Sequence, residues 1–125
     1  MINIVCPSRY KINSRSIKQT VTEVLIEQKQ PTRAVLNVVF IGTRKMREIA
    51  KTYKHENVAL PVLAFAYKEL DMSGENFLGE IFLCYPQVIL LAAERGKMAD
   101  EMINRMVEHG LKNIIEDKST PVVMS

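Results

Sequence analysis

The 125-residue sequence predicts a single α+β domain in which a four-stranded mixed sheet packs with about four helices, in the order βαβαββαα. Short apolar runs rich in Val, Ile and Phe alternate with longer segments whose apolar residues recur every three or four positions, a pattern typical of strands and amphipathic helices. Residues 67–76 join two of the strand-like runs and are too few for a crossover helix, so these two strands should pair antiparallel. The length suits one domain, residues 1–125, with one hydrophobic core.

The first half of the chain predicts two β–α pairs. An apolar run over 2–6 predicts a strand, and Ile17, Val21, Val24 and Leu25 then recur at helical spacing within a helix expected over 14–30, with a polar start near Asn13 or Ser14. The nearly continuous apolar run over 34–41 is typical of a central strand buried on both faces. Gly42 turns the chain, and Thr43 is expected to cap a helix over 43–53.

The second half predicts two strands followed by two helices. The strands are expected over 62–66 and 77–84. Pro86 suits the first turn of a helix over 86–95 that Gly96 ends. A last helix is expected over 98–116, and the tail over 118–125 is expected to be loosely ordered.

Composition favours an ordinary globular protein, with 47% hydrophobic and 25% charged residues. No apolar run approaches the roughly 20 residues needed to span a bilayer. The N-terminus lacks the pattern of a signal peptide, so a cytoplasmic location is expected. Cys6 and Cys84 lie in strand-like runs and are interpreted as small buried hydrophobes of a reducing compartment.

The charges are distributed unevenly along the chain. Residues 1–68 hold twelve Lys and Arg against four Asp and Glu, whereas residues 69–125 hold five against ten. Such a basic half is a candidate surface for phosphates, and ordinary solvated helix faces are the alternative. The basic side chains in question are Arg9, Lys11, Arg15, Lys18, Arg44, Lys45, Arg47, Lys51 and Lys54.

The last third of the chain carries a specific pattern. The strand reads Leu78-Gly79-Glu80-Ile81, a helix follows from Pro86, and His109-Gly110 stands in the last turns of the final helix. This order resembles the YbeY family of rRNA-maturation endoribonucleases, whose signature is a strand L-G-D-I, a Pro-started helix and the motif H-G-x-x-H-x-x-G-x-D-H. The resemblance extends from about residue 4 to residue 119 and implies a minimal zincin-like fold.

The resemblance implies that three histidines bind one zinc ion, which activates water against an RNA phosphodiester. The matching positions here hold His109, Asn113 and Ser119. An amide oxygen suits hard cations better than zinc, and a serine hydroxyl is a poor zinc ligand, so zinc is expected to bind weakly or not at all. Glu116, Asp117 or His55 could stand in for a lost ligand. The alternative for His109 is a helix histidine packed beside Met102 and Met106.

A second family segment, Y-R-x-K-D-x-P-T-D-V-L-S-F, corresponds to residues 53–65. Tyr53 and Phe65 match, whereas Lys54 replaces an arginine that could grip a phosphate with two hydrogen bonds. Tyr53, Phe65 and Phe77 are expected to serve the core. Glu80 could hold a helix end, orient a ligand or face solvent.

Three functions remain open on these residues. The first is a metal-dependent endoribonuclease with Lys54 and His109 as catalytic residues, in the cytoplasm with rRNA and the small ribosomal subunit as partners, as the resemblance implies. The second is a non-catalytic RNA- or ribosome-binding protein, and the third is a scaffold without retained activity. Neither a membrane nor DNA is an expected partner. The RNA-binding residues are expected on the second helix, where they could border the cleft that holds His109: Arg44, Lys45, Arg47, Lys51 and Lys54.

Overall fold

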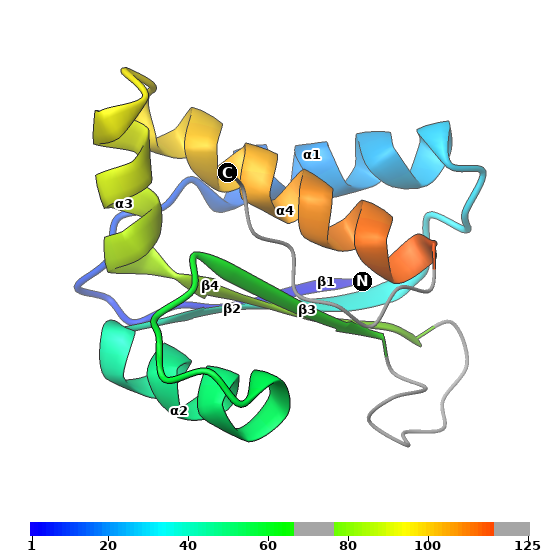
Figure 1. Ribbon diagram of the computed structural model, residues 1–125. Coiled ribbons are helices and arrows are strands. Elements are labelled where there is room, and N and C mark those ends of the chain that lie inside the picture. Colours follow the sequence, from blue (N-terminus) through cyan, green and yellow to red (C-terminus); the bar gives the residue numbers. More distant parts are fainter. Residues whose placement is uncertain (67–76, 117–125) are drawn as a thin grey trace.

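The structure is a computed structural model that describes residues 1–66 and 77–116. Its elements follow the predicted order βαβαββαα, as Figure 1 shows. The bounds are β1 Ile2–Val5, α1 Ser14–Glu27, β2 Val35–Ile41, α2 Thr43–Lys54, β3 Val62–Ala66, β4 Phe77–Cys84, α3 Tyr85–Glu94 and α4 Ala99–Ile115.

The four strands form one mixed sheet in the order β1-β2-β4-β3. β1 pairs parallel with β2, β2 pairs parallel with β4, and β3 pairs antiparallel with β4. The predicted central position of the strand over 34–41 and the predicted antiparallel pair are both confirmed. The parallel strands β2 and β4 end together, with Ile41 opposite Cys84, so the helices that follow them start at the same edge of the sheet.

The helices cover the two faces of the sheet unequally. Figure 1 shows α1 and α4 side by side on one face, α2 alone on the other, and α3 standing at the end of the sheet. The larger apolar core lies under α1 and α4 and includes Leu36, Val38, Ile81 and Leu83. A smaller cluster beneath α2 includes Met46, Ala50, Leu63, Phe65 and Cys84, and its margin is only half-buried.

Several predicted bounds are corrected by the structure. Thr43 does not cap the second helix: Gly42 is the N-cap, without a side-chain hydrogen bond. The first helix ends at Glu27 because Gln28 is its C-cap and Lys29 turns into the left-handed region at φ 57°. Its predicted polar start is confirmed, since the Asn13 side chain accepts a hydrogen bond from the Ser16 N–H at 3.0 Å.

Close packing explains the glycine after His109. A Cβ at Gly110 would lie 3.2 Å from two side-chain atoms of Ile81, so the backbone of α4 rests directly on β4. Both thiols are free, Cys84 buried and Cys6 only half-buried, and burial raises the pKa of each. This is the opposite of what a nucleophilic cysteine needs.

The predicted tail over 118–125 lies outside the described residues. Among the helices that the structure does describe, none has the length and apolarity to cross a membrane.

Candidate functional site

His109 is exposed on the surface of α4. Met102, Met106 and Gly110 of the same helix are buried against the sheet, and His109 falls just outside that buried arc. The interpretation of His109 as a histidine packed in the core beside the two methionines is therefore wrong. Its imidazole remains accessible as a ligand or hydrogen-bonding group.

The described residues around His109 do not supply a complete set of zinc ligands. Asn113, one turn further along α4, is half-buried and offers an amide, while Glu116 is the exposed C-cap of the helix. Ser119 and Asp117 lie outside the described residues, and across residues 1–66 and 77–116 no group of three or more His, Cys, Asp and Glu could hold a metal. One imidazole and one amide are not the three-ligand set that a catalytic zinc site requires.

His55 lies in a different layer of the molecule. It is the C-cap of α2, in the left-handed conformation at φ 59°, and is exposed. α2 and α4 cover opposite faces of the sheet (Figure 1), so His55 and His109 belong to separate layers. The structure does not bring them together as a metal pair.

A hollow of about 440 Å³ between α1 and α4 borders His109 and is mainly acidic. Its lining includes Glu23, Glu27, Glu101 and Glu108, opposed by Arg105. Lys112 bridges two of these carboxylates, at 2.9 Å from Glu108 and 3.6 Å from Glu27. The hydrogen bond and charge of Glu108 raise the pKa of Lys112. Such a surface repels phosphates.

The predicted RNA-binding residues lie together along α2. Arg44, Lys45, Arg47 and Lys51 are exposed and Lys54 is half-buried. Arg44 and Lys45 line a hollow of about 650 Å³ at the carboxyl end of β2, whereas the His109 hollow is lined from α1 and α4. The structure therefore separates these basic residues from His109 by the thickness of the sheet, and Lys54 and His109 do not share a hollow.

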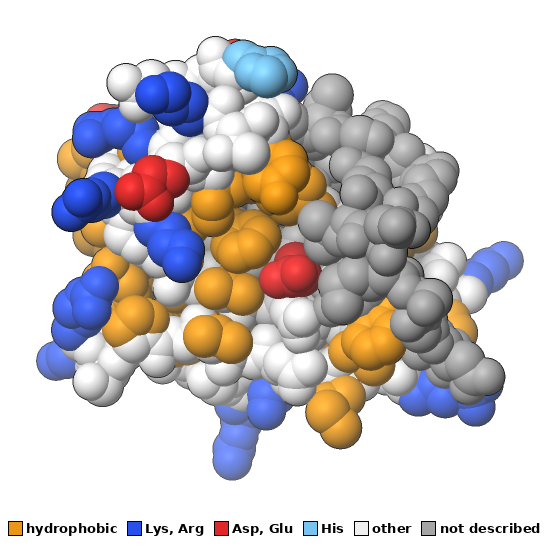
Figure 2. Space-filling model, turned by 90° about the horizontal axis from the view of Figure 1, so that it is seen from below, with side chains coloured by type: hydrophobic (Ala, Val, Ile, Leu, Met, Phe, Trp, Pro, Cys, Tyr) orange, Lys and Arg blue, Asp and Glu red, His pale blue; other side chains and the backbone are white. Residues whose placement is uncertain are grey.

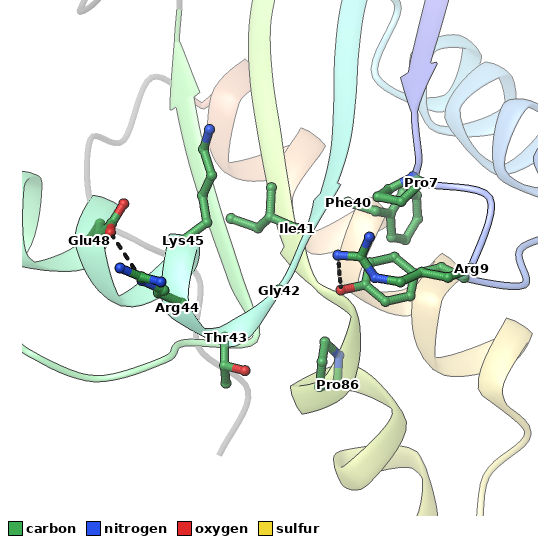
Figure 3. A pocket seen from close by; sticks show the side chains of 11 residues that line it. Pro7, Arg9, Phe40, Ile41, Gly42, Thr43, Arg44, Lys45, Glu48 and Pro86 are labelled. Carbon is green, nitrogen blue, oxygen red and sulfur yellow. Dashed lines mark hydrogen bonds and ion pairs between the residues drawn. The ribbon is translucent and has the colours of Figure 1, made fainter.

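Arg9 reaches the same hollow from the loop after β1. Figure 3 shows its floor at Ile41 and Gly42, with Arg44 and Lys45 on one side and Arg9 on the other. The Arg9 guanidinium lies 4.7 Å from the Tyr10 ring centroid, and Tyr10 stacks on Tyr85 at 4.3 Å. These aromatic contacts hold Arg9 in place and lower the entropy cost of binding an anion.

The backbone at this edge also favours anions. α2 and α3 both begin here, without an acidic residue in the first turn or a side-chain cap. The first-turn N–H groups of α2 add positive potential to that of Arg9, Arg44 and Lys45. Of the described residues that line this hollow, one is acidic: Glu48, in an exposed 3.9 Å ion pair with Arg44. The carboxyl edge of β2 is thus the electropositive end of this hollow.

Sequence reasoning missed the role of Tyr10 and misplaced two aromatic residues. Phe65 is buried as expected, but Tyr53 is 56% and Phe77 39% exposed, so their assignment to the core is wrong. Tyr53 stands on the open side of Phe65, 5.0 Å between ring centroids. The match of Tyr53 to the family segment marked the position without indicating its exposure.

Comparison with known proteins gives consistent results. The sequence profile of the family described as Endoribonuclease YbeY matches residues 4–114. The chain is 31% identical over 90 residues to an Endoribonuclease YbeY of Thermodesulfovibrio yellowstonii, covering 72% of this chain and 57% of that protein. It is 35% identical over 81 residues to one of Pseudomonas savastanoi pv. phaseolicola, covering 64% and 49%. The chain thus spans about half of the length of these relatives.

A solved structure has the same fold. The solution structure of TM1509 from Thermotoga maritima superposes with a TM-score of 0.62, covering 96% of this chain and 75% of that one, at 19% identity. At this identity the likeness concerns the fold, and it agrees with the predicted α+β architecture.

Proposed function

The chain belongs to the endoribonuclease YbeY family, and from that premise we propose that it is an rRNA-maturation protein that binds RNA on the α2 side of its sheet and whose metal-dependent cleavage is impaired. The small ribosomal subunit and its RNA are the proposed partners, and the cytoplasm is the proposed location. The observation that carries the proposal is the donor set on α4, an exposed His109 followed one turn later by Asn113.

Impaired cleavage follows from ligand chemistry. Zinc chemistry in this family would supply a nucleophilic hydroxide at neutral pH, which requires firm binding of the ion. His109 and Asn113 supply one good zinc ligand and one poor one. In addition, the carboxylates around His109 oppose the approach of a phosphodiester. Lys54 keeps a positive charge at the position of the family's arginine but provides no bidentate phosphate contact.

RNA binding on the α2 side follows from the charges of that side. Arg44, Lys45, Arg47 and Lys51 project from one exposed helix, and Arg9 joins them from another segment. Contacts of this kind hold an RNA backbone without selecting its sequence. The expected binding is salt-sensitive because phosphate neutralisation releases counterions.

The first experiment measures metal and cleavage together. We expect purified protein to lose zinc on dialysis against a weak chelator and to cleave single-stranded RNA weakly. Asn113→His with Ser119→His should raise zinc affinity, measured by competition with a chromogenic chelator. Stoichiometric zinc after dialysis, or strong cleavage that His109→Ala abolishes, would show that the protein is an active enzyme.

The second experiment measures RNA binding by fluorescence anisotropy at several salt concentrations. Replacing Arg9, Arg44 and Lys45 together by Ala should weaken binding and reduce the slope of log K against log[salt] by about 2, since each phosphate contact to a single strand contributes about 0.7. Replacing Arg44, Lys45 and Arg47 together by Ala should have a similar effect.

The matched control removes the same charge from the other face. It replaces three exposed basic residues on α1 and the loop after it: Lys18, Lys29 and Arg33. This variant should retain the affinity and salt slope of the parent protein. Equal losses in the two triple variants would mean that net charge, and not the α2 side, determines binding.

A further inference from the structure

The sheet face that carries α2 is only partly covered. Ile49, Val39 and Phe82 at the margin of the α2 cluster remain half-buried, and Tyr53 is exposed. Figure 2 shows hydrophobic side chains gathered on this face, with Lys and Arg side chains along one side of them. Open sheet faces with accessible aromatic rings are a common platform for unpaired RNA bases.

A hollow of about 310 Å³ opens on this face beside α2. α2 contributes Lys45, Ile49 and Tyr53, β3 contributes Phe65, and β4 contributes Glu80 and Phe82. Phe65 lies between the other two rings, tilted 59° to Tyr53 at 5.0 Å and edge-on to Phe82 at 6.0 Å. The volume is at the small end of ligand pockets and suits one planar group.

Among the described residues that line this hollow, Glu80 is the one acidic residue. It lies opposite Phe65 on β3 and Asn37 on β2, so its carboxylate emerges from the middle of the sheet. Among residues 1–66 and 77–116 its carboxylate has no hydrogen-bond or ion-pair partner. Burial raises its pKa, because the charged form of the carboxyl group loses part of its solvation in the hollow. A ligand that donates hydrogen bonds to the carboxylate would replace the lost solvation.

We propose that this hollow binds a guanine base of single-stranded RNA, which stacks on the exposed Tyr53 ring and donates N1–H and N2–H to the Glu80 carboxylate. Lys45 contacts the adjoining phosphate. The inference rests on the proposed RNA-binding function and assigns to that surface a base preference and the residues that produce it.

Guanine is selected because a carboxylate only accepts hydrogen bonds. On its Watson–Crick edge guanine presents two adjacent donors, N1–H and N2–H, which match the two carboxylate oxygens. Adenine and cytosine each pair one amino donor with a ring-nitrogen acceptor, and uracil flanks its single N–H with two carbonyls. The acceptors of these three bases would face the Glu80 oxygens and be repelled.

Lys45 connects this hollow to the basic one at the carboxyl end of β2. Its side chain is part of the lining of both. In Figure 3 the Lys45 side chain extends along the sheet and away from Gly42, whereas Arg9 lies on the opposite side of Gly42. A strand with its phosphates near Arg9 and Arg44 would pass Lys45 and place its next base against Tyr53. Lys45 is thus the residue through which one strand would contact both hollows.

The test uses fluorescent uridine hexamers with one central position occupied by guanine, inosine, adenine or uracil. Inosine keeps N1–H but lacks the N2 amino group. We expect the guanine hexamer to bind about tenfold more tightly than the adenine and uracil hexamers, with inosine between them. Glu80→Gln should abolish this difference, so that the guanine, adenine and uracil hexamers bind with equal affinity. Tyr53→Ala should weaken binding of the guanine hexamer about tenfold, whereas Tyr53→Phe should bind this hexamer as tightly as the parent protein does.

Controls separate this inference from the proposed function. Glu56→Gln removes the same charge from the exposed loop after α2 and should keep the guanine preference. Circular dichroism checks that each variant is folded. Equal binding of the four wild-type hexamers, or a guanine preference that survives Glu80→Gln, would overturn the guanine site and leave RNA binding intact.

If no hexamer binds, the proposed function fails, and a titration with guanosine monophosphate against adenosine monophosphate tests the base site by itself. Amide shifts around Glu80 and Tyr53 with the guanosine compound alone would support the site. No shift, or the same shifts with both nucleotides, would refute it.

Discussion

Gly110→Ala tests how tightly α4 rests on the sheet. The glycine lies inside a 17-residue helix, where alanine would ordinarily stabilise the fold by about 1 kcal/mol. At this position the new methyl group would lie 3.2 Å from Cδ1 and Cγ2 and 3.3 Å from Cγ1 of Ile81. The sign of the effect therefore depends on whether Ile81 can move.

Ile81 has little freedom to move. It is fully buried in the interior strand β4, and two of the three atoms involved are attached to its branched Cβ, so relief requires a change in χ1 or a backbone shift. Overpacking of this kind costs about 1–3 kcal/mol. Set against the helix gain, we expect the free energy of unfolding to fall by about 1 kcal/mol, which lowers Tm by about 4 °C at this chain length.

Urea unfolding followed by circular dichroism measures the change. A double-mutant cycle with Ile81→Val identifies the contact, since removing Cδ1 should cost less in the alanine variant than in the parent, by about 0.5 kcal/mol or more. A Gly110→Ala protein as stable as the parent, or a cycle without coupling, would refute close packing as the reason for the glycine.

Three further predictions concern stability. Asn13→Ala should cost about 1 kcal/mol in urea unfolding because it removes the N-cap of α1, whereas Ser14→Ala should have little effect. Gly96→Ala should cost about 1–2 kcal/mol by the same assay, because the residue has a φ of +62°, which alanine adopts only with strain. A Cβ at this position would meet no atom within 4 Å, so the cost comes from the backbone conformation and not from a clash. Burial raises the pKa of Glu80, so the folded state binds the proton more tightly and the charged carboxylate destabilises the fold at neutral pH. Glu80→Gln should therefore be more stable than the parent at about pH 7. This gain should shrink as the pH falls through the folded pKa of Glu80 and should be lost below the ordinary glutamate pKa. The same difference in melting temperature between variant and parent at about pH 7 and below the glutamate pKa would contradict this prediction.

The order and type of the elements follow from local pattern. Apolar residues at helical spacing predicted the buried face of α1, and the nearly continuous apolar run ending at Ile41 predicted an interior strand. These signals depend only on neighbours in sequence, which is why they survive without tertiary information. The bounds were less certain because caps depend on individual dihedral angles, as at Gly42 and Lys29.

The sequence identified the site residues one by one, but it did not predict which of them lie together in space. Lys45, Tyr53, Glu80 and His109 each stood out in the sequence, yet Lys45 was expected beside His109 and Tyr53 in the core. The periodicity of a helix tells which side is apolar, but it does not tell which face of the sheet the helix will cover. That choice is made by strand order and by the connections between strands. It placed α2 on the face opposite α4, and so brought Lys45 and Tyr53 to Glu80 and left His109 among carboxylates.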